Sequence, residues 1–187
     1  MKMKRILLAA LGLILMAGDL CALEVKGVPV GPAVTLQGQT LQLNGVGIRK
    51  KFFMAIYVGS LYTAKRVSSG EEAALDGGGK LIRMNFLYDK LDRQKIVESF
   101  AEGLAANSPD LQGAEDVTRF LSWFSKDFVR GDVVDLELAG DGTVSARHNG
   151  ALLGRLKSPA LARGVLLIYL GKKPADNDLK SGMLGRD

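Results

Sequence analysis

Three consecutive cations, Arg49, Lys50 and Lys51, lie in a stretch of sequence that is otherwise apolar and aromatic. If this stretch forms a strand, the two-residue period places Arg49 and Tyr57 on the same face. A planar guanidinium binds a carboxylate through two parallel hydrogen bonds, and a phenol can donate a further one. At the mouth of an apolar cavity, such a pair would hold the acidic head of an acyl chain. Arg49 and Tyr57 are therefore the candidate ligand-binding residues.

The spacing of these two residues leaves a second interpretation open. Along a regular strand they lie about 26 Å apart at 3.3 Å per residue, so their side chains converge only if the strand is bent or bulged. Otherwise Arg49 is a surface cation near the start of a strand, and Tyr57 is a core ring with its hydroxyl at the edge. Spacing alone favours this structural interpretation.

The residue types present argue against several other kinds of chemistry. The chain has one histidine, His148, and one cysteine, Cys21, so a zinc site of nitrogen and sulfur ligands is not expected. No Gly-x-Ser-x-Gly elbow and no phosphate-binding Gly-x-x-x-x-Gly-Lys motif occurs. We expect no metal and no cofactor, and we interpret His148 as a solvated residue beside the Asn149-Gly150 turn. An axial haem ligand, which needs only one such nitrogen, is the alternative.

The first half of the chain is expected to form mainly strands. Residues 23–43 contain short alternating stretches broken by Gly and Pro, which is typical of small strands and tight turns. Residues 46–64 are rich in aromatic and β-branched residues and predict either one long strand bent at Gly59 or a tight pair. Residues 71–75 predict one helical turn, and residues 80–88 predict a strand with a single buried face. That face comprises Ile82, Met84, Phe86 and Tyr88.

The period then changes to that of a helix. Residues 92–106 and 115–128 carry apolar side chains at helical spacing and predict two amphipathic helices. An antiparallel meander is predicted at residues 132–139, 143–147 and 151–157. A helix begins at Ser158-Pro159, where a capping hydroxyl precedes a proline, and a short helix follows Pro174. Because strands and helices do not alternate strictly, we predict an α+β fold, a mostly antiparallel sheet covered on one face by helices.

Residues 1–22 have the pattern of a secretory signal peptide, with a basic start, an apolar run and small residues before a cut that we place after Ala22. A membrane anchor needs about 20 apolar residues, and Asp19 interrupts the run too early; lipid modification of Cys21 is a minor alternative.

Cleavage removes three of the 25 basic and one of the 20 acidic residues, so the formal charge falls from +5 to +3, too low for a nucleic-acid-binding surface. We expect one periplasmic domain over residues 23–187, without a stable membrane span or a disulfide; the sequence assigns no oligomeric state.

Two parts of the sequence carry motifs of a known family. The first runs over residues 43–53 (LNGVGIRKKFF) and continues over residues 55–62 (AIYVGSLY). The second comprises SPAL at residues 158–161, LGKKP at residues 170–174 and LKSGMLG at residues 179–185. These stretches resemble the chalcone isomerase superfamily, in particular its bacterial exported chalcone isomerase-like members. The resemblance spans essentially all of the chain after the signal peptide, and it implies an open-faced β-sandwich with a ligand cleft between sheet and helices.

Within that superfamily, the resemblance to the plant isomerases is incomplete. Those enzymes use an Arg, a Thr, a Tyr and an Asn around the substrate. Arg49 matches the Arg, Tyr57 stands in the place of the Thr, and the Tyr and Asn positions fall near Asp92 and Ser99. Loss of these groups removes transition-state stabilisation and argues against ring closure, so we assign no catalytic residue.

The fatty-acid-binding branch instead pairs its Arg with a Tyr on the same long strand, which Arg49 and Tyr57 resemble. We therefore predict a non-catalytic periplasmic binding protein for a small apolar ligand with an acidic head, such as a fatty acid. The candidate lining residues, which any helix-on-sheet core would also use, are Phe86, Tyr88, Phe100, Leu104, Phe120 and Phe124. The alternatives are an isomerase or lyase with Arg49 as electrophile and Tyr57 as acid, a haem or tetrapyrrole binder, and an interaction module whose cleft is filled by its own side chains.

Overall fold

The computed structural model describes residues 23–186. The strands are β1 (Leu23–Val25), β2 (Val28–Val30), β3 (Ala33–Leu36), β4 (Gln39–Lys51), β5 (Met54–Thr63), β6 (Lys80–Phe86), β7 (Lys90–Leu91), β8 (Phe128–Val129), β9 (Val133–Leu138), β10 (Thr143–His148) and β11 (Ala151–Lys157). The helices are α1 (Gly70–Leu75), α2 (Arg93–Asn107), a 3-10 turn η1 (Pro109–Leu111), α3 (Glu115–Ser122), α4 (Pro159–Leu170) and α5 (Asn177–Met183). The predicted signal peptide, residues 1–22, lies outside the described residues.

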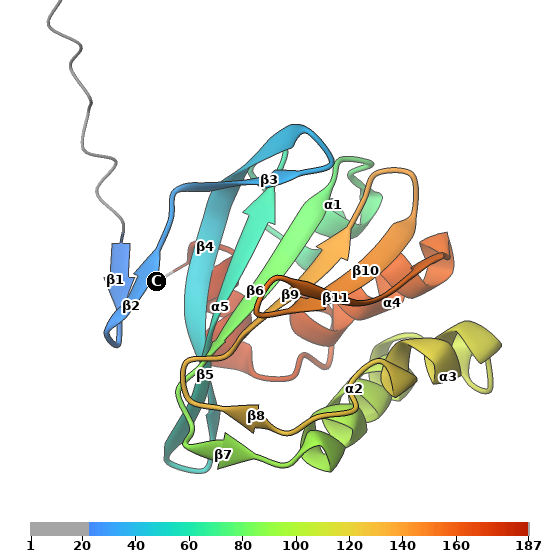
Figure 1. Ribbon diagram of the computed structural model, residues 1–187. Coiled ribbons are helices and arrows are strands. Elements are labelled where there is room, and N and C mark those ends of the chain that lie inside the picture. The colour runs from blue at the N-terminus through green and yellow to red at the C-terminus, as the bar shows by residue number, and fades with distance from the viewer. Residues whose placement is uncertain (1–22, 187) are drawn as a thin grey trace, which may run out of the picture.

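A curled antiparallel sheet of seven strands forms the centre of the molecule, with α1, α4 and α5 behind it in Figure 1. The strand order is β11-β10-β9-β6-β5-β4-β3, and two short sheets, β1-β2 and β7-β8, stand beside it. Helices α2 and α3 lie at the lower edge of this layer in Figure 1. The predicted α+β fold with a mostly antiparallel sheet and helices on one face is confirmed.

Of the two alternatives predicted for residues 46–64, the tight pair is confirmed, formed by the end of β4 and all of β5. The other alternative, one strand bent at Gly59, is wrong, because Gly59 lies within β5 directly opposite Gly47. A Cβ at Gly59 would lie 2.7 Å from Cδ1 of Leu179, and a Cβ at Gly47 would lie 2.8 Å from the carbonyl oxygen of the same residue. These glycines therefore allow α5 to approach the sheet closely.

Helix α5 is held against β4 by backbone contact and by one buried amide. A Cβ at Gly45 would overlap the carbonyl oxygen of Gly182, so only glycine fits at this crossing. The buried Asn44 side chain donates hydrogen bonds to the carbonyl of Val67 at 3.0 Å and to the carbonyl of Met183 at 2.8 Å. These contacts fix the C-terminal helix over the middle of β4.

The second predicted helix, residues 115–128, is shorter than the pattern indicated, because α3 ends at Ser122. Phe124 follows the helix, and Phe128 lies in β8, where it pairs with Leu91. Both rings are nevertheless buried in the main core. Helix α3, the turn after it and strand β8 thus all supply apolar side chains to one core. The spacing of these side chains in the sequence matches that of a longer helix, although the backbone after Ser122 is not helical.

The remaining predicted elements, namely α1, α2, the β9-β10-β11 meander, α4 and α5, are confirmed. Ser158 caps α4 by accepting a hydrogen bond from the N–H of Leu161 at 3.3 Å, and Pro159 occupies the first turn. Asp92 and Asp176 cap α2 and α5 through their carboxylates. No helix among the described residues is both long and apolar enough to span a membrane.

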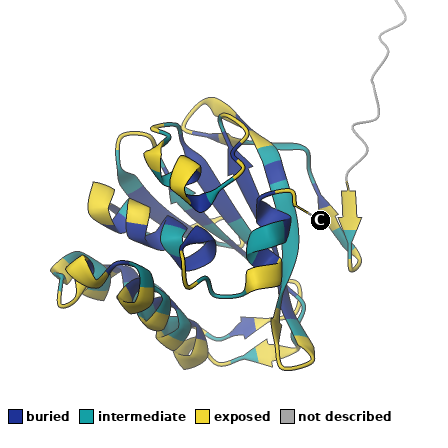
Figure 2. Ribbon diagram, turned by 180° about the vertical axis from the view of Figure 1, so that it is seen from behind, coloured by how far each residue is buried: buried dark blue, intermediate teal, exposed yellow. Residues whose placement is uncertain are grey.

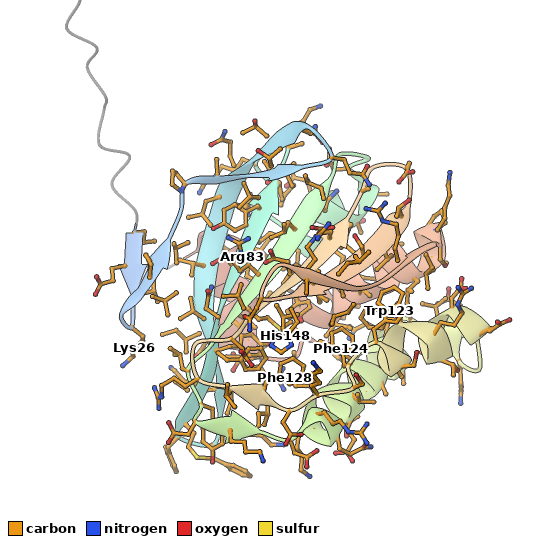
Figure 3. All side chains as sticks on the ribbon, in the orientation of Figure 1. Lys26, Arg83, Trp123, Phe124, Phe128 and His148 are labelled. Atoms are coloured by element: carbon orange, nitrogen blue, oxygen red, sulfur yellow. The ribbon has the colours of Figure 1, made fainter. Side chains whose placement is uncertain are left out.

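The main core lies between the sheet and the helices, where the inner sides of α4 and α5 are buried (Figure 2). A second, smaller cluster on the other face of the sheet contains Leu36, Leu41, Tyr62 and Leu81. The predicted buried face of β6, with Ile82, Met84 and Phe86, is confirmed; on the opposite face Leu81 is buried, whereas Arg83 and Asn85 are partly exposed. The smaller cluster crosses the sheet from β3 to β6, because each of these four neighbouring strands supplies one of its residues. Arg83 lies on this same face (Figure 3).

Candidate functional site

Arg49 and Tyr57 are direct partners in the antiparallel ladder between β4 and β5. The register shifts immediately beyond this pair, because β5 has an extra residue, Ile56, that opposes no residue of β4. Tyr57 is in turn the ladder partner of Phe86 on β6, and the two ring centroids lie 5.6 Å apart. The three side chains form a row across β4, β5 and β6. A turn between strands, rather than a bend within one strand, brings the predicted pair together.

Arg49 reaches from the sheet to helix α2. Its Nη2 donates a hydrogen bond to Oγ of Ser99 at 3.2 Å, and the side chain is half-buried. Among the described residues, the Arg49 guanidinium forms no ion pair, whereas Arg83, Arg130 and Arg147 each pair with a carboxylate. A guanidinium in this setting retains donors for an anionic group from outside the fold.

Two buried tyrosine hydroxyls lie near this guanidinium. Burial raises the pKa of Tyr57, and the charge and hydrogen bonding of Arg49 offset that rise only in part. Burial, together with the neighbouring Tyr57, raises the pKa of Tyr169 well above its ordinary value. The Tyr169 hydroxyl donates to Sδ of Met84 at 3.3 Å. Both phenols are therefore protonated at neutral pH and can act as hydrogen-bond donors.

Sequence reasoning missed Tyr169. The residue lies on α4 at helical spacing from Leu161 and Val165, so the pattern marked it only as part of a buried face. The available signal was its hydroxyl, because a buried tyrosine usually needs a hydrogen-bond partner. Of the two uncertain family positions, Ser99 contacts Arg49, whereas Asp92 caps α2 by accepting a hydrogen bond from the N–H of Gln94 at 2.7 Å.

The predicted lining residues meet in the core beneath α2 and α3. Five of them are at most 3% exposed, namely Phe86, Phe100, Leu104, Phe120 and Phe124, and Tyr88 is partly buried against the same core. The Phe100 ring centroid lies 5.7 Å from that of Phe120 and 5.0 Å from that of Phe124. The structure thus brings these residues together, and their own side chains fill the space between them.

Two cavities adjoin the same helices. One of about 110 Å³ lies beside Phe124 and His148, between the meander and the segment after α3 (Figure 3). Another of about 630 Å³ lies at the C-terminal end of α2, and Arg163 of α4 is part of its lining. Neither cavity is lined by Arg49 or Tyr57. The candidate head site and these two openings are therefore separate features.

His148 is more buried than its position beside a turn predicted. Its Nε2 lies 3.0 Å from Oδ2 of Asp132, and its ring centroid lies 5.2 Å from that of Phe128. Burial raises the pKa of Asp132, but hydrogen bonds from the Val129 N–H and the Asn149 amide, together with His148, hold that pKa below its ordinary value. This arrangement aims Nε2 at a carboxylate rather than at an open ligand position. Among the described residues, no group of three His, Cys, Asp or Glu side chains has the arrangement of a metal site.

The curled antiparallel sheet and its helical cover have the architecture of the chalcone isomerase-like fold. The chain belongs to the chalcone isomerase-like family, whose model matches residues 22–185. It is 24% identical over 178 residues to fatty-acid-binding protein 1 of Arabidopsis thaliana, covering 79% of this chain and 64% of that relative, so it spans less than two thirds of the relative's length. It is also similar to the crystal structure of an Arabidopsis thaliana fatty-acid-binding protein, with a TM-score of 0.60 and 22% identity over 81% of this chain and 95% of the other. The predicted family and fold are confirmed.

Proposed function

We propose that this protein is a non-catalytic binding protein for a small apolar ligand with an acidic head, and that a fatty acid is its representative ligand. The observation that carries this proposal is the position of Arg49, half-buried and without an ion pair among the described residues, directly opposite the protonated Tyr57. The comparisons support it, because both similar proteins are named for fatty-acid binding.

The acidic head would bind at the row formed by Arg49 and Tyr57. The guanidinium can donate two parallel hydrogen bonds to a carboxylate. Tyr57 can donate a third, because a phenol is protonated at neutral pH. The positive charge lowers the pKa of the bound carboxyl, so the ligand binds as its anion.

The acyl chain would extend from this row into the core between the sheet and α2 and α3. Because the predicted lining side chains fill that core, binding requires α2 to move away from the sheet. The hydrogen bond from Arg49 to Ser99 is one tie between β4 and α2. A carboxylate that replaces Ser99 as the acceptor breaks this tie, so binding of the head and opening of the core are coupled.

The same residues are poorly suited to proton transfer. A general acid or base works best when its pKa lies near the working pH, and burial moves the pKa of Tyr57 away from that range. The Asp92 carboxylate is used in the cap of α2. Arg49 can therefore stabilise a negative charge, but neither Tyr57 nor Asp92 is suited to transfer a proton beside it. This combination favours a binding function over a catalytic one.

The proposal includes export to the periplasm by a signal peptide over residues 1–22, cleaved after Ala22. The basic start, apolar run and small residues of this segment support it. The only cysteine, Cys21, belongs to the segment, so the mature domain would rely on packing and hydrogen bonds rather than a disulfide.

Displacement of a fluorescent fatty acid by palmitate from the purified protein tests the binding proposal. Arg49→Ala should weaken the affinity by on the order of tenfold or more, because a charge-assisted pair is lost. Arg163→Ala is the matched control, since it removes a cation from the separate 630 Å³ cavity and should leave the affinity unchanged. Failure of the wild-type protein to bind, or loss of affinity in Arg163→Ala alone, would refute the proposal.

A further inference from the structure

The turn between β4 and β5 exposes an apolar tip, formed by Phe52, Phe53 and Met54. The exposed fractions of these residues are 83%, 102% and 44%, respectively. Single exposed apolar residues are common on protein surfaces, but three in succession make a continuous apolar projection. Nothing in the described fold covers this tip, so its burial requires an external surface.

The backbone of the apolar tip is also unusual for this chain. Phe52 has a φ of 56°, in the left-handed region that favours glycine and asparagine. Three other two-residue hairpin turns place a polar residue and a glycine at positive φ, namely Lys26-Gly27, Gln37-Gly38 and Asn149-Gly150. Those turns form tight hairpins without exposing aromatic surface. The β4-β5 turn keeps two phenylalanines where the same chain elsewhere uses turn-forming residues, and the fold gives no reason for it.

The charge of this hairpin has a single sign. Residues 39–63 contain no Asp or Glu, and their only charged side chains are Arg49, Lys50 and Lys51. Lys50 and Lys51 are exposed and directly precede the apolar tip. Lys50 lies 3.5 Å from the exposed Asp178, and a pair so open to solvent contributes little. The hairpin therefore ends in aromatic rings with cations immediately behind them.

The small β7-β8 sheet extends this surface. It lies beside the end of the hairpin in Figure 1, where the N–H of Leu87 donates to the carbonyl of Ile56 at 2.9 Å. Val129 of β8 is 45% exposed, and the exposed Lys90 of β7 pairs with Asp127 at 3.1 Å. This end of the molecule combines apolar side chains with exposed charged groups.

We propose that the apolar tip docks this protein on the surface of an anionic lipid bilayer. Aromatic side chains favour the interfacial layer of a membrane, and adjacent lysines favour anionic headgroups. The same lysines disfavour a second copy of the chain as the occupant, because contact between two tips would bring Lys50 and Lys51 of both copies together. Aromatic rings and cations on one hairpin thus fit a lipid surface.

Docking in this orientation places the candidate head site near the headgroups. Arg49 precedes Phe52 by three residues of β4, roughly 10 Å at 3.3 Å per residue, and the headgroup layer is itself roughly 5–8 Å thick. A fatty acid in a bilayer holds its carboxylate in this layer. The apolar tip would therefore present Arg49 and Tyr57 to membrane-held carboxylates, a step that rests on the proposed function, whereas docking itself does not.

Flotation with phosphatidylcholine vesicles containing phosphatidylglycerol tests the docking proposal. The double variant Phe52→Gly and Phe53→Asn places glycine at the turn position that has a positive φ and a turn-forming polar residue after it, so it should fold with an unchanged or higher Tm and bind these vesicles at least tenfold more weakly. Leu75→Ser, which removes another exposed apolar side chain on α1, should bind as wild type. Lys51→Glu should weaken binding to anionic vesicles but not to pure phosphatidylcholine.

Equal vesicle binding by the wild-type protein and the double variant would overturn the proposal, as would no binding by the wild type. A wild-type dimer in analytical ultracentrifugation that the double variant abolishes, without vesicle binding, would instead assign the apolar tip to self-association. The two proposals fail separately. Vesicle docking without binding of dissolved palmitate refutes only the proposed function, and palmitate binding without docking refutes only the role of the apolar tip.

Discussion

Arg49 on β4 faces Tyr57 on β5 as its direct ladder partner, with the one-residue bulge at Ile56 between this pair and the turn. A slip of one residue in this pairing would turn one of the two side chains to the opposite face of the sheet. The bulge therefore belongs to the candidate site as much as the two side chains do. The Arg49 guanidinium also contacts Ser99 of α2.

Tyr57→Phe is expected to weaken palmitate affinity by about threefold to tenfold, because a single neutral donor is lost. The fold should be retained, since the ring still packs against Phe86. Isothermal titration calorimetry measures the change, with Tyr62→Phe, on the other face of the sheet, as a control. An affinity equal to that of the wild type would remove Tyr57 from the head site.

The buried phenols should make the protein sensitive to alkali. Burial raises the pKa of both Tyr57 and Tyr169, so the stability that their protonated forms provide is complete below the unfolded pKa of about 10 and is lost as pH rises toward the folded values. Urea unfolding should show a falling free energy of unfolding above about pH 10, and Tyr57→Phe should reduce that fall. The same alkaline slope in both proteins would contradict this expectation.

Asp132 is expected to contribute to acid sensitivity. Burial raises the pKa of Asp132, but hydrogen bonds and His148 lower it by more, so the folded pKa lies below the unfolded value of about 4. The stability that the ionised carboxylate provides is therefore complete above about pH 4 and is lost as pH falls through the folded pKa. Asp132→Asn should reduce the free energy of unfolding at pH 7 by about 1–3 kcal/mol and flatten its decline below about pH 4. Urea titrations between pH 2 and pH 7 measure both effects, and an unchanged acid slope would count against this role.

The close crossing of α5 over β4 predicts a steep cost for one methyl group. Gly45→Ala should lower the free energy of unfolding by about 2–4 kcal/mol, because the new Cβ meets the backbone of α5. Gly77→Ala is the matched control, since a Cβ there has no atom within 4 Å, and its effect should stay within about 0.5 kcal/mol. Similar Tm values for the two variants would show that the crossing is less tight than described.

Export can be tested by expressing the full chain in a bacterial host. The periplasmic fraction should contain a protein whose N-terminus is Leu23, because the predicted cut follows Ala22. Intact-mass measurement of each fraction identifies the processed species. A protein that keeps residues 1–22 and remains in the cytoplasm would contradict the proposed location.

Periodicity predicted most of the fold, and the misses have identifiable causes. The helix at Ser158-Pro159 was predictable because a capping hydroxyl and a proline mark a helix start locally. The β4-β5 turn was predicted only as one of two alternatives, since the composition of Phe52 and Phe53 is typical of a strand and does not mark the position of the turn. The end of α3 was hidden because Phe124 and Phe128 enter the same core from non-helical backbone.

The candidate site was predictable in its residue types but not in its geometry. Arg49 and Tyr57 were identifiable as a donor pair, whereas their convergence depends on a turn and a bulge that local sequence does not mark. Tyr169 was hidden among aliphatic neighbours on α4. Whether Phe100 and Phe120 line a cleft or fill a core could not be read from sequence either, because both outcomes require the same apolar side chains.

The central claim is that the Arg49 guanidinium holds the carboxylate of the ligand. The most direct measurement is a pH titration, by NMR, of palmitate labelled with carbon-13 at its carboxyl group and bound to the wild-type protein or to Arg49→Lys. In the wild type, the bound carboxyl should stay ionised to a lower pH than in the variant, because the bidentate hydrogen bonds stabilise the anion. The same titration midpoint in both proteins would place the carboxylate away from Arg49 and contradict the account.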